Sequence, residues 1–180
     1  MRPVIFCDID GVVRLMKAYG APGIDPFPKL NNLAVDYYFD AECVTLLTNL
    51  VRNTNAQLVI ISTLRRLYDW ETLLAGFAAS KFPVDHIHPD RMEGVAEYTE
   101  QLIMGGKDRA EEIMAWLDNH LEVKNWCVLD DEMRHYENPR CGIGRERVFV
   151  PSTRFGLQPR LAASIHEFLL NRHKPITFCA

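Results

Sequence analysis

The stretch VIFCDIDGVV, residues 4–13, decides the fold class of this chain. It begins with apolar residues that do not alternate with polar ones, which is typical of a strand buried on both faces of a sheet. Two carboxylates, Asp8 and Asp10, follow, and Gly11 ends the run. Because two acids at a buried strand end are costly without a function, we expect this segment to carry chemistry.

The rest of the chain alternates between apolar runs and helical patterns. After a first strand over residues 3–8, the predicted strands are residues 57–61, 125–129 and 147–150, with a short one at 84–88. The predicted helices are residues 40–53, capped by Asp40, then 64–81, a helix starting at Asp108, and 159–171. This alternation predicts an α/β chain with a three-layer Rossmann-like fold and a mostly parallel central sheet.

The length of 180 residues fits a single domain spanning residues 1–180. Residues 12–39 contain three prolines and two glycines, which predicts a flap-like excursion and leaves no room for a large cap domain. The oligomeric state is not determined by the sequence.

Composition excludes several classes of protein. No apolar run is long enough to span a membrane, and the N-terminus enters a strand at once, so we expect neither a membrane anchor nor a signal peptide. Five scattered cysteines argue against a disulfide framework and favour a reducing, cytoplasmic location. The net charge of −4 gives no general attraction to nucleic acid, although six arginines fall within residues 134–160.

Polar side chains follow three of the predicted strands. Asp8 and Asp10 end the first, Ser62 and Thr63 the second, and Asp130 and Asp131 the fourth. The carboxyl ends of parallel strands meet at one edge of a sheet, so these groups should converge. Four carboxylates repel one another unless a cation lies among them, and Mg²⁺ is the hard, oxygen-liganded ion that suits such a site.

These motifs together resemble the haloacid dehalogenase (HAD) superfamily. VIFCDIDGVV is similar to its D-x-D-G first motif, LVIIST to its second, a basic helix start to its third, and WCVLDDE to its fourth. A narrower likeness is to the HAD domains associated with RNA-repair proteins, on STLRR, RAEEIMAWL, VLDDE and the later residues Phe155-Gly156-Leu157. Leu64 stands where that group has Trp.

The resemblance implies a Mg²⁺-dependent phosphohydrolase that acts on a phosphate monoester. Asp8 would attack phosphorus to form an aspartyl-phosphate. Asp10 would serve as general acid and base. The metal would be held by Asp8, the Asp10 carbonyl, Asp130 and Asp131.

The remaining groups would bind the phosphoryl group and the substrate. Ser62 would hydrogen-bond a phosphoryl oxygen, while Thr63 and Arg65 would contact substrate. The third-motif base would be Lys107 or Arg109. Lys107 is favoured because Lys is the commoner residue in the superfamily, and Arg109 would then contact the substrate.

The substrate is left open between two kinds. Without a large cap, an open site can admit a polymer, so we expect a nucleic-acid end; a small phosphorylated metabolite or nucleotide is the alternative. A non-catalytic HAD-like binding module is a further alternative, which the intact acids disfavour. His86 and His88 have the spacing of one strand face and could bind a metal, but no third ligand lies nearby in the sequence.

Overall fold

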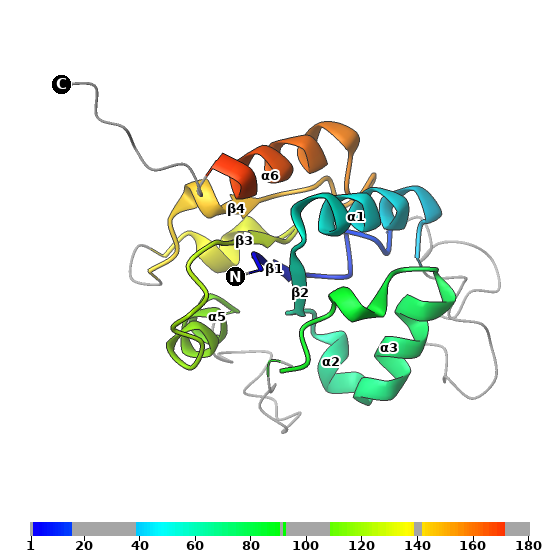
Figure 1. The fold of residues 1–180 in the computed structure, drawn as a ribbon, viewed down its shortest axis with the longest axis horizontal. Coiled ribbons are helices and arrows are strands. Elements are labelled where there is room, and N and C mark those ends of the chain that lie inside the picture. The colour runs from blue at the N-terminus through cyan, green and yellow to red at the C-terminus, as the bar shows by residue number, and fades with distance from the viewer. Residues whose placement is uncertain (1, 16–38, 91, 93–108, 139–141, 172–180) are drawn as a thin grey trace.

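The computed structural model describes residues 2–15, 39–90, 92, 109–138 and 142–171. Four parallel strands form one sheet in the order β2-β1-β3-β4 (Figure 1). The strands are β1 (Val4–Cys7), β2 (Gln57–Ile60), β3 (Trp126–Leu129) and β4 (Val148–Phe149). The α/β class and the parallel sheet predicted from the apolar runs are therefore confirmed.

The strand β1 lies in the middle of the sheet, and its side chains alternate between two cores. Ile5 and Cys7 belong to the core beneath α1 (Ala41–Thr54), α3 (Trp70–Ala79) and α6 (Pro159–Asn171). Val4 and Phe6 belong to the opposite core, which packs against α5 (Arg109–Asp118). The result is a three-layer sandwich, with helices on both faces of the sheet (Figure 1).

The first long helix begins and ends where its sequence predicts. The Asp40 carboxylate accepts hydrogen bonds from the backbone N–H groups of Glu42, at 3.1 Å, and Cys43, at 3.2 Å, as an N-cap does. The chain leaves the helix at Asn55, whose φ is 53°, a left-handed conformation that asparagine tolerates.

Two predicted elements differ from the structure. The single helix expected over residues 64–81 is two helices, α2 (Leu64–Leu67) and α3, because Tyr68 is extended and Asp69 caps α3 through the Thr72 N–H at 2.7 Å. The strand expected over residues 84–88 is a 3-10 turn, η3 (Val84–His86), which leaves Ile87 in a single bridge to Leu58. The helical periodicity of residues 64–81 does not show where the helix is interrupted. The apolar run at residues 84–88 likewise does not distinguish a strand from a 3-10 turn.

The described start of the predicted excursion belongs to the core. Val12, Val13 and Leu15 are buried, and the turn is closed by three N–H groups that donate to the Ile9 carbonyl. Of the expected flap at 12–39, residues 12–15 and residue 39 are described; residues 16–38 lie outside the described part of the chain.

Gly156 docks onto this turn. Its φ is +64°, and an added Cβ would lie 2.5 Å from the Val12 carbonyl oxygen, so only glycine allows this approach. The next residue, Leu157, is fully buried and donates its N–H to the same Val12 carbonyl at 2.9 Å. In the described ranges, no helix is both long enough and apolar enough to cross a membrane.

Candidate active site

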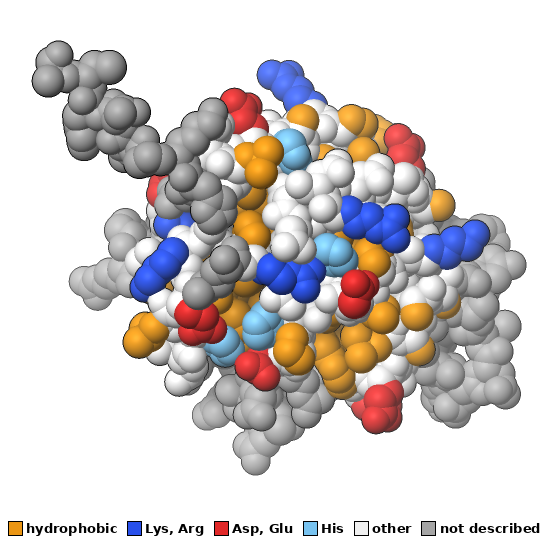
Figure 2. All heavy atoms as spheres, in the orientation of Figure 1, with side chains coloured by type: hydrophobic (Ala, Val, Ile, Leu, Met, Phe, Trp, Pro, Cys, Tyr) orange, Lys and Arg blue, Asp and Glu red, His pale blue; other side chains and the backbone are white. Residues whose placement is uncertain are grey.

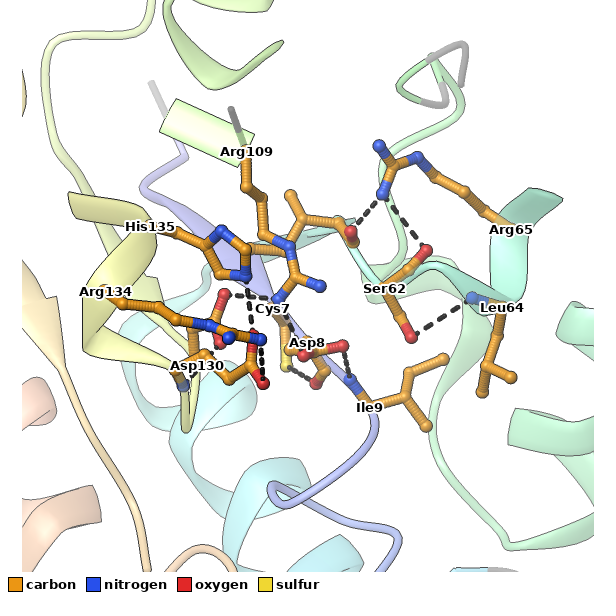
Figure 3. A network of polar contacts seen from close by, with 12 residues as sticks. Cys7, Asp8, Ile9, Ser62, Leu64, Arg65, Arg109, Asp130, Arg134 and His135 are labelled. Carbon is orange, nitrogen blue, oxygen red and sulfur yellow. Dashed lines mark hydrogen bonds and ion pairs between the residues drawn. The ribbon is translucent and has the colours of Figure 1, made fainter. Parts of the chain in front are cut away.

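The polar groups that follow β1, β2 and β3 meet at the carboxyl edge of the sheet (Figure 3). Asp8, Asp130 and Asp131 each place a carboxylate oxygen within 4.8 Å of the others. The strand register brings Cys7, Ile60 and Leu129 level with one another, so each polar residue emerges at the same edge. The convergence of these strand ends is therefore found as the sequence predicts.

Asp8 is the most deeply engaged of the predicted catalytic residues. It is 4% exposed, its Oδ1 accepts the Ile9 N–H at 2.7 Å, and its Oδ2 faces Arg109 Nη1 at 2.8 Å. Burial raises the pKa of Asp8 to about 6, with Asp130 adding to the rise and Arg109 opposing it. The carboxylate is held in one orientation by a backbone amide on one oxygen and a guanidinium on the other.

Asp130 is fully buried and holds three hydrogen bonds. Its Oδ2 accepts from Tyr136 Oη and from Arg109 Nη1, both at 2.6 Å, and its Oδ1 accepts the Glu132 N–H at 2.9 Å. Burial and the nearby Asp130 charge raise the pKa of Tyr136 well above its ordinary value, so its hydroxyl stays a donor. Asp130 is thus fixed by donors from three directions.

Arg109 bridges the two buried acids. It is the first residue of α5, and its Nη1 contacts Asp8 and Asp130 together (Figure 3). Burial acts to lower the pKa of Arg109, but the two carboxylates outweigh it, and the pKa is raised. Lys107, favoured from the sequence as the third-motif base, lies outside the described residues, so the choice between Lys107 and Arg109 stays a prediction.

Asp131 lies against the backbone of the first motif. An added Cβ at Gly11 would lie 2.0 Å from Asp131 Oδ2, and Gly11 has a φ of +68°. Burial raises the pKa of Asp131, a hydrogen bond with Thr153 acting in the opposite direction. The glycine of D-x-D-G is therefore needed both for the turn and for the close approach of this acid.

Asp10 lies apart from the three-acid cluster. Its side chain is 33% exposed and pairs with Arg14, whose Nη1 lies 3.4 Å from Asp10 Oδ1. Arg14 itself is buried. The acid–base role and the metal contact expected of Asp10 stay predictions, and its carboxylate is charge-paired and accessible to solvent.

Ser62 and Thr63 follow β2 with different exposures. Ser62 is fully buried, its Oγ accepts the Leu64 N–H at 3.3 Å, and a hydrogen bond between its side chain and Asp8 lowers the Asp8 pKa. Thr63 is exposed and makes no capping hydrogen bond through its side chain. Ser62 thus accepts the first N–H of α2 and contacts the predicted nucleophile.

Arg65 is engaged within the protein. Its side chain is 4% exposed, and its guanidinium ion-pairs with Glu112. It also donates to the carbonyls of Ile61 and Ser62, the latter at 3.0 Å (Figure 3). The side chain is turned into the protein because Glu112, one turn from Arg109 on α5, offers it a buried charge. We therefore infer that Arg65 holds the second-motif loop against α5, while its expected contact with substrate stays a prediction.

A hard divalent cation fits this donor set. Three carboxylates from two strand ends offer oxygens within 4.8 Å, and oxygen ligands of this kind are those that Mg²⁺ prefers. Each carboxylate oxygen has two lone pairs, so the single Glu132 N–H on Asp130 Oδ1 leaves that atom able to accept a cation.

Sequence reasoning missed Tyr136, Glu112 and Arg14. Tyr136 follows Asp130 by six residues without a motif, and nothing in the sequence marks it. Glu112 was visible only as part of R-x-x-E, where its three-residue spacing from Arg109 places both on one helix face. Arg14 follows Asp10 by four residues, but it lies in a segment that the sequence predicts to be irregular, so the pairing was not expected.

One comparison with known proteins identifies a family for this chain. A family described as the HAD domain in Swiss Army Knife RNA repair proteins matches residues 4–162. The chain belongs to this family. No match was found among curated proteins or among solved structures. Membership places the chain among HAD-type phosphohydrolase domains, and both the superfamily and the RNA-repair likeness drawn from the motifs are confirmed.

Proposed function

We propose that this HAD domain is a Mg²⁺-dependent phosphatase that hydrolyses a phosphate monoester through an aspartyl-phosphate on Asp8. The observation that carries the proposal is the meeting of Asp8, Asp130 and Asp131 within 4.8 Å, with Arg109 bridging the first two. Asp8, Asp130 and Asp131 would hold the ion, which would neutralise charge on the phosphoryl oxygens and allow an anionic substrate to approach an anionic nucleophile.

The residues of this chain supply the other steps. Asp8 attacks phosphorus, and the bond to the leaving oxygen breaks as the Asp8 carboxylate–phosphorus bond forms. Asp10, whose side chain is 33% exposed, would give a proton to that oxygen and later accept one from the attacking water. Arg109 and the Ser62 hydroxyl offset the charge on the phosphoryl oxygens.

The nucleophile and the metal are tested with p-nitrophenyl phosphate. Asp8→Asn should abolish turnover, whereas Asp118→Asn, the same change at an exposed position on α5, should not. Acid-quenched wild-type protein should carry one phosphoryl group by intact mass. Activity of Asp8→Asn within tenfold of wild type, or full activity after removal of divalent ions, would refute the proposal.

The substrate that we propose is a phosphorylated nucleic-acid end. The family description names RNA repair, and Arg134 supports the idea because its side chain is 73% exposed and pairs with Glu132, two residues after the buried Asp130. Arg147 does not serve this purpose, since its guanidinium stacks 4.1 Å from the Trp126 ring centroid. The face shown in Figure 2 mixes basic, acidic and apolar side chains without a continuous basic stripe, which favours recognition of an end over wrapping of a strand.

Arg134→Ala tests this substrate class. It should lower kcat/KM for a phosphorylated oligonucleotide more than for p-nitrophenyl phosphate, and raising the salt concentration should weaken oligonucleotide binding. Arg52→Ala, at an exposed position in the last turn of α1, is the control. A higher kcat/KM for a sugar phosphate or mononucleotide than for every oligonucleotide tested would favour the small-metabolite alternative.

A further inference from the structure

Two histidines and an aspartate meet on the molecule away from the carboxylate cluster. His88, Asp90 and His120 each place a ligand atom within 4.8 Å of the others. His88 follows η3 along the edge of β2, where its N–H donates to the Leu58 carbonyl at 2.8 Å, and His120 lies just beyond α5. Since α5 starts at Arg109 and has ten residues, its length puts this cluster roughly 15 Å from the active site.

The contact between His120 and Asp90 needs a cation. His120 Nδ1 lies 2.7 Å from the Trp116 carbonyl, which can only accept, so Nδ1 carries a hydrogen. In a neutral imidazole, Nε2 then carries a lone pair and no hydrogen, and this nitrogen lies 3.1 Å from Asp90 Oδ2. Two lone pairs at this distance repel unless a proton or a metal ion lies between them.

The distances suit a metal ion. Zn²⁺ binds imidazole nitrogen and carboxylate oxygen at about 2.0–2.1 Å in a tetrahedral arrangement, which separates neighbouring ligands by roughly 3.3 Å. The distance of 3.1 Å between His120 Nε2 and Asp90 Oδ2 is close to this ligand–ligand separation. The hydrogen bond from His120 Nδ1 to a backbone carbonyl is the support that metal-bound histidines generally have.

Trp116 holds the three residues in place. Its ring stacks on His120, with centroids 3.6 Å apart and planes at 10°, and meets the His88 ring edge-on at 5.0 Å. Its indole N–H also faces the Asp90 carbonyl at 3.3 Å. Because Trp116 is 6% exposed and belongs to the core, the positions of the candidate ligands are set by the fold.

We propose that His88, Asp90 and His120 form a second metal site, which takes a divalent ion of the Zn²⁺ class and ties the end of α5 to the segment after η3. Imidazole ligands favour Zn²⁺ over Mg²⁺, so the ion differs from that proposed for the carboxylate cluster. His88 Nδ1 accepts the Asp90 N–H at 3.2 Å, which is a long and exposed hydrogen bond. When the metal ion binds, the Asp90 amide can donate to water instead. Figure 2 shows histidine and acidic side chains together on the face that carries α5.

Titration of the chelator-treated chain with Co²⁺ in excess Mg²⁺ tests the site, because tetrahedral Co²⁺ gives a visible absorption band that Zn²⁺ then removes. The band should be present in wild type and absent in His88→Ala and His120→Ala. Asp90→Asn, at a side chain 67% exposed, should weaken binding at least about tenfold without loss of fold.

Three controls separate this site from others. His86→Ala and Asp85→Asn change nearby residues outside the cluster, and Asp8→Asn changes the carboxylate site; all three should keep the band. Absence of binding in wild type would show an imidazolium–carboxylate pair only and would overturn the proposal. An unchanged band in His120→Ala, loss of the band in Asp8→Asn, or a thiolate-to-Co²⁺ band in the near ultraviolet would overturn it equally. None of these readouts depends on the phosphatase proposal.

Discussion

Replacing Glu112 by Gln should destabilise the fold through a single buried ion pair. The Arg65 and Glu112 side chains are 4% and 7% exposed, so neither charge can be solvated when the other is removed. Leaving one buried charge without its partner costs about 3–5 kcal/mol of unfolding free energy. The pair joins the loop after β2 to the helix that carries Arg109, so its loss should disturb the second and third motifs together.

The magnitude can be measured by urea unfolding. With a denaturant dependence of about 2 kcal/mol per molar urea, a loss of 3–5 kcal/mol lowers the midpoint by about 1.5–2.5 M. Glu111→Gln is the matched control, because Glu111 is the neighbouring residue on α5 and is exposed. It should change the midpoint by no more than about 0.25 M, the effect of a surface substitution near 0.5 kcal/mol.

The double variant Arg65→Met/Glu112→Leu separates charge burial from loss of packing. Apolar side chains of similar volume remove both buried charges, so the double variant should be more stable than either Glu112→Gln or Arg65→Met alone. If Glu112→Gln unfolds at the same urea concentration as Glu111→Gln, the pair does not hold the loop, and the structural role assigned to Arg65 is wrong.

Three further changes test close contacts. Gly156→Ala should lower the free energy of unfolding, measured in urea, by about 1–3 kcal/mol more than Gly142→Ala does. Both glycines have positive φ, but only at Gly156 would the Cβ lie 2.5 Å from a backbone carbonyl oxygen. Equal losses in the two variants would contradict this reasoning. Gly11→Ala should raise the Mg²⁺ concentration for half-maximal activity by displacing Asp131; an unchanged value would remove Asp131 from the metal site. Burial raises the pKa of Cys43 from 9.0 to about 11, which lowers its thiolate fraction at pH 8 about a hundredfold, so alkylation followed by site-resolved mass spectrometry should label Cys43 quickly only in urea.

The layers of the fold could be predicted because each strand is a short apolar run followed by polar residues. The pattern placed β1, β2 and β3 within one residue at each end, and the polar residues after them marked the edge where the site forms. The break between α2 and α3 could not be seen in the same way. Tyr68 and Asp69 fit a helical pattern, and only the extended backbone of Tyr68 and the cap of Asp69 divide it.

The site was predictable where its residues lie in motifs and not where they pair across the fold. Asp8 and Asp130 were found because each ends a strand. The ion pair of Arg65 could not be predicted because its partner Glu112 is 47 residues away, and the motif carries no sign of which way the guanidinium turns. Tyr136 was missed because an aromatic residue in a short 3-10 turn has no recognisable pattern, although it donates to Asp130 at 2.6 Å.

The hydrogen bonds on Asp130 have a consequence for how ligands bind. With Tyr136, Arg109 and the Glu132 N–H all donating to it, this side chain has a single accessible rotamer before any ligand arrives. The conformational entropy of ordering it is lost during folding, so it does not reduce the affinity of a ligand. Arg134 is the opposite case: its side chain is 73% exposed and pairs with Glu132, so a phosphate that binds there must compete with that carboxylate for the guanidinium. We therefore expect the chemistry at the buried Asp130 to be insensitive to substrate type, and discrimination between substrates to arise at the exposed Arg134.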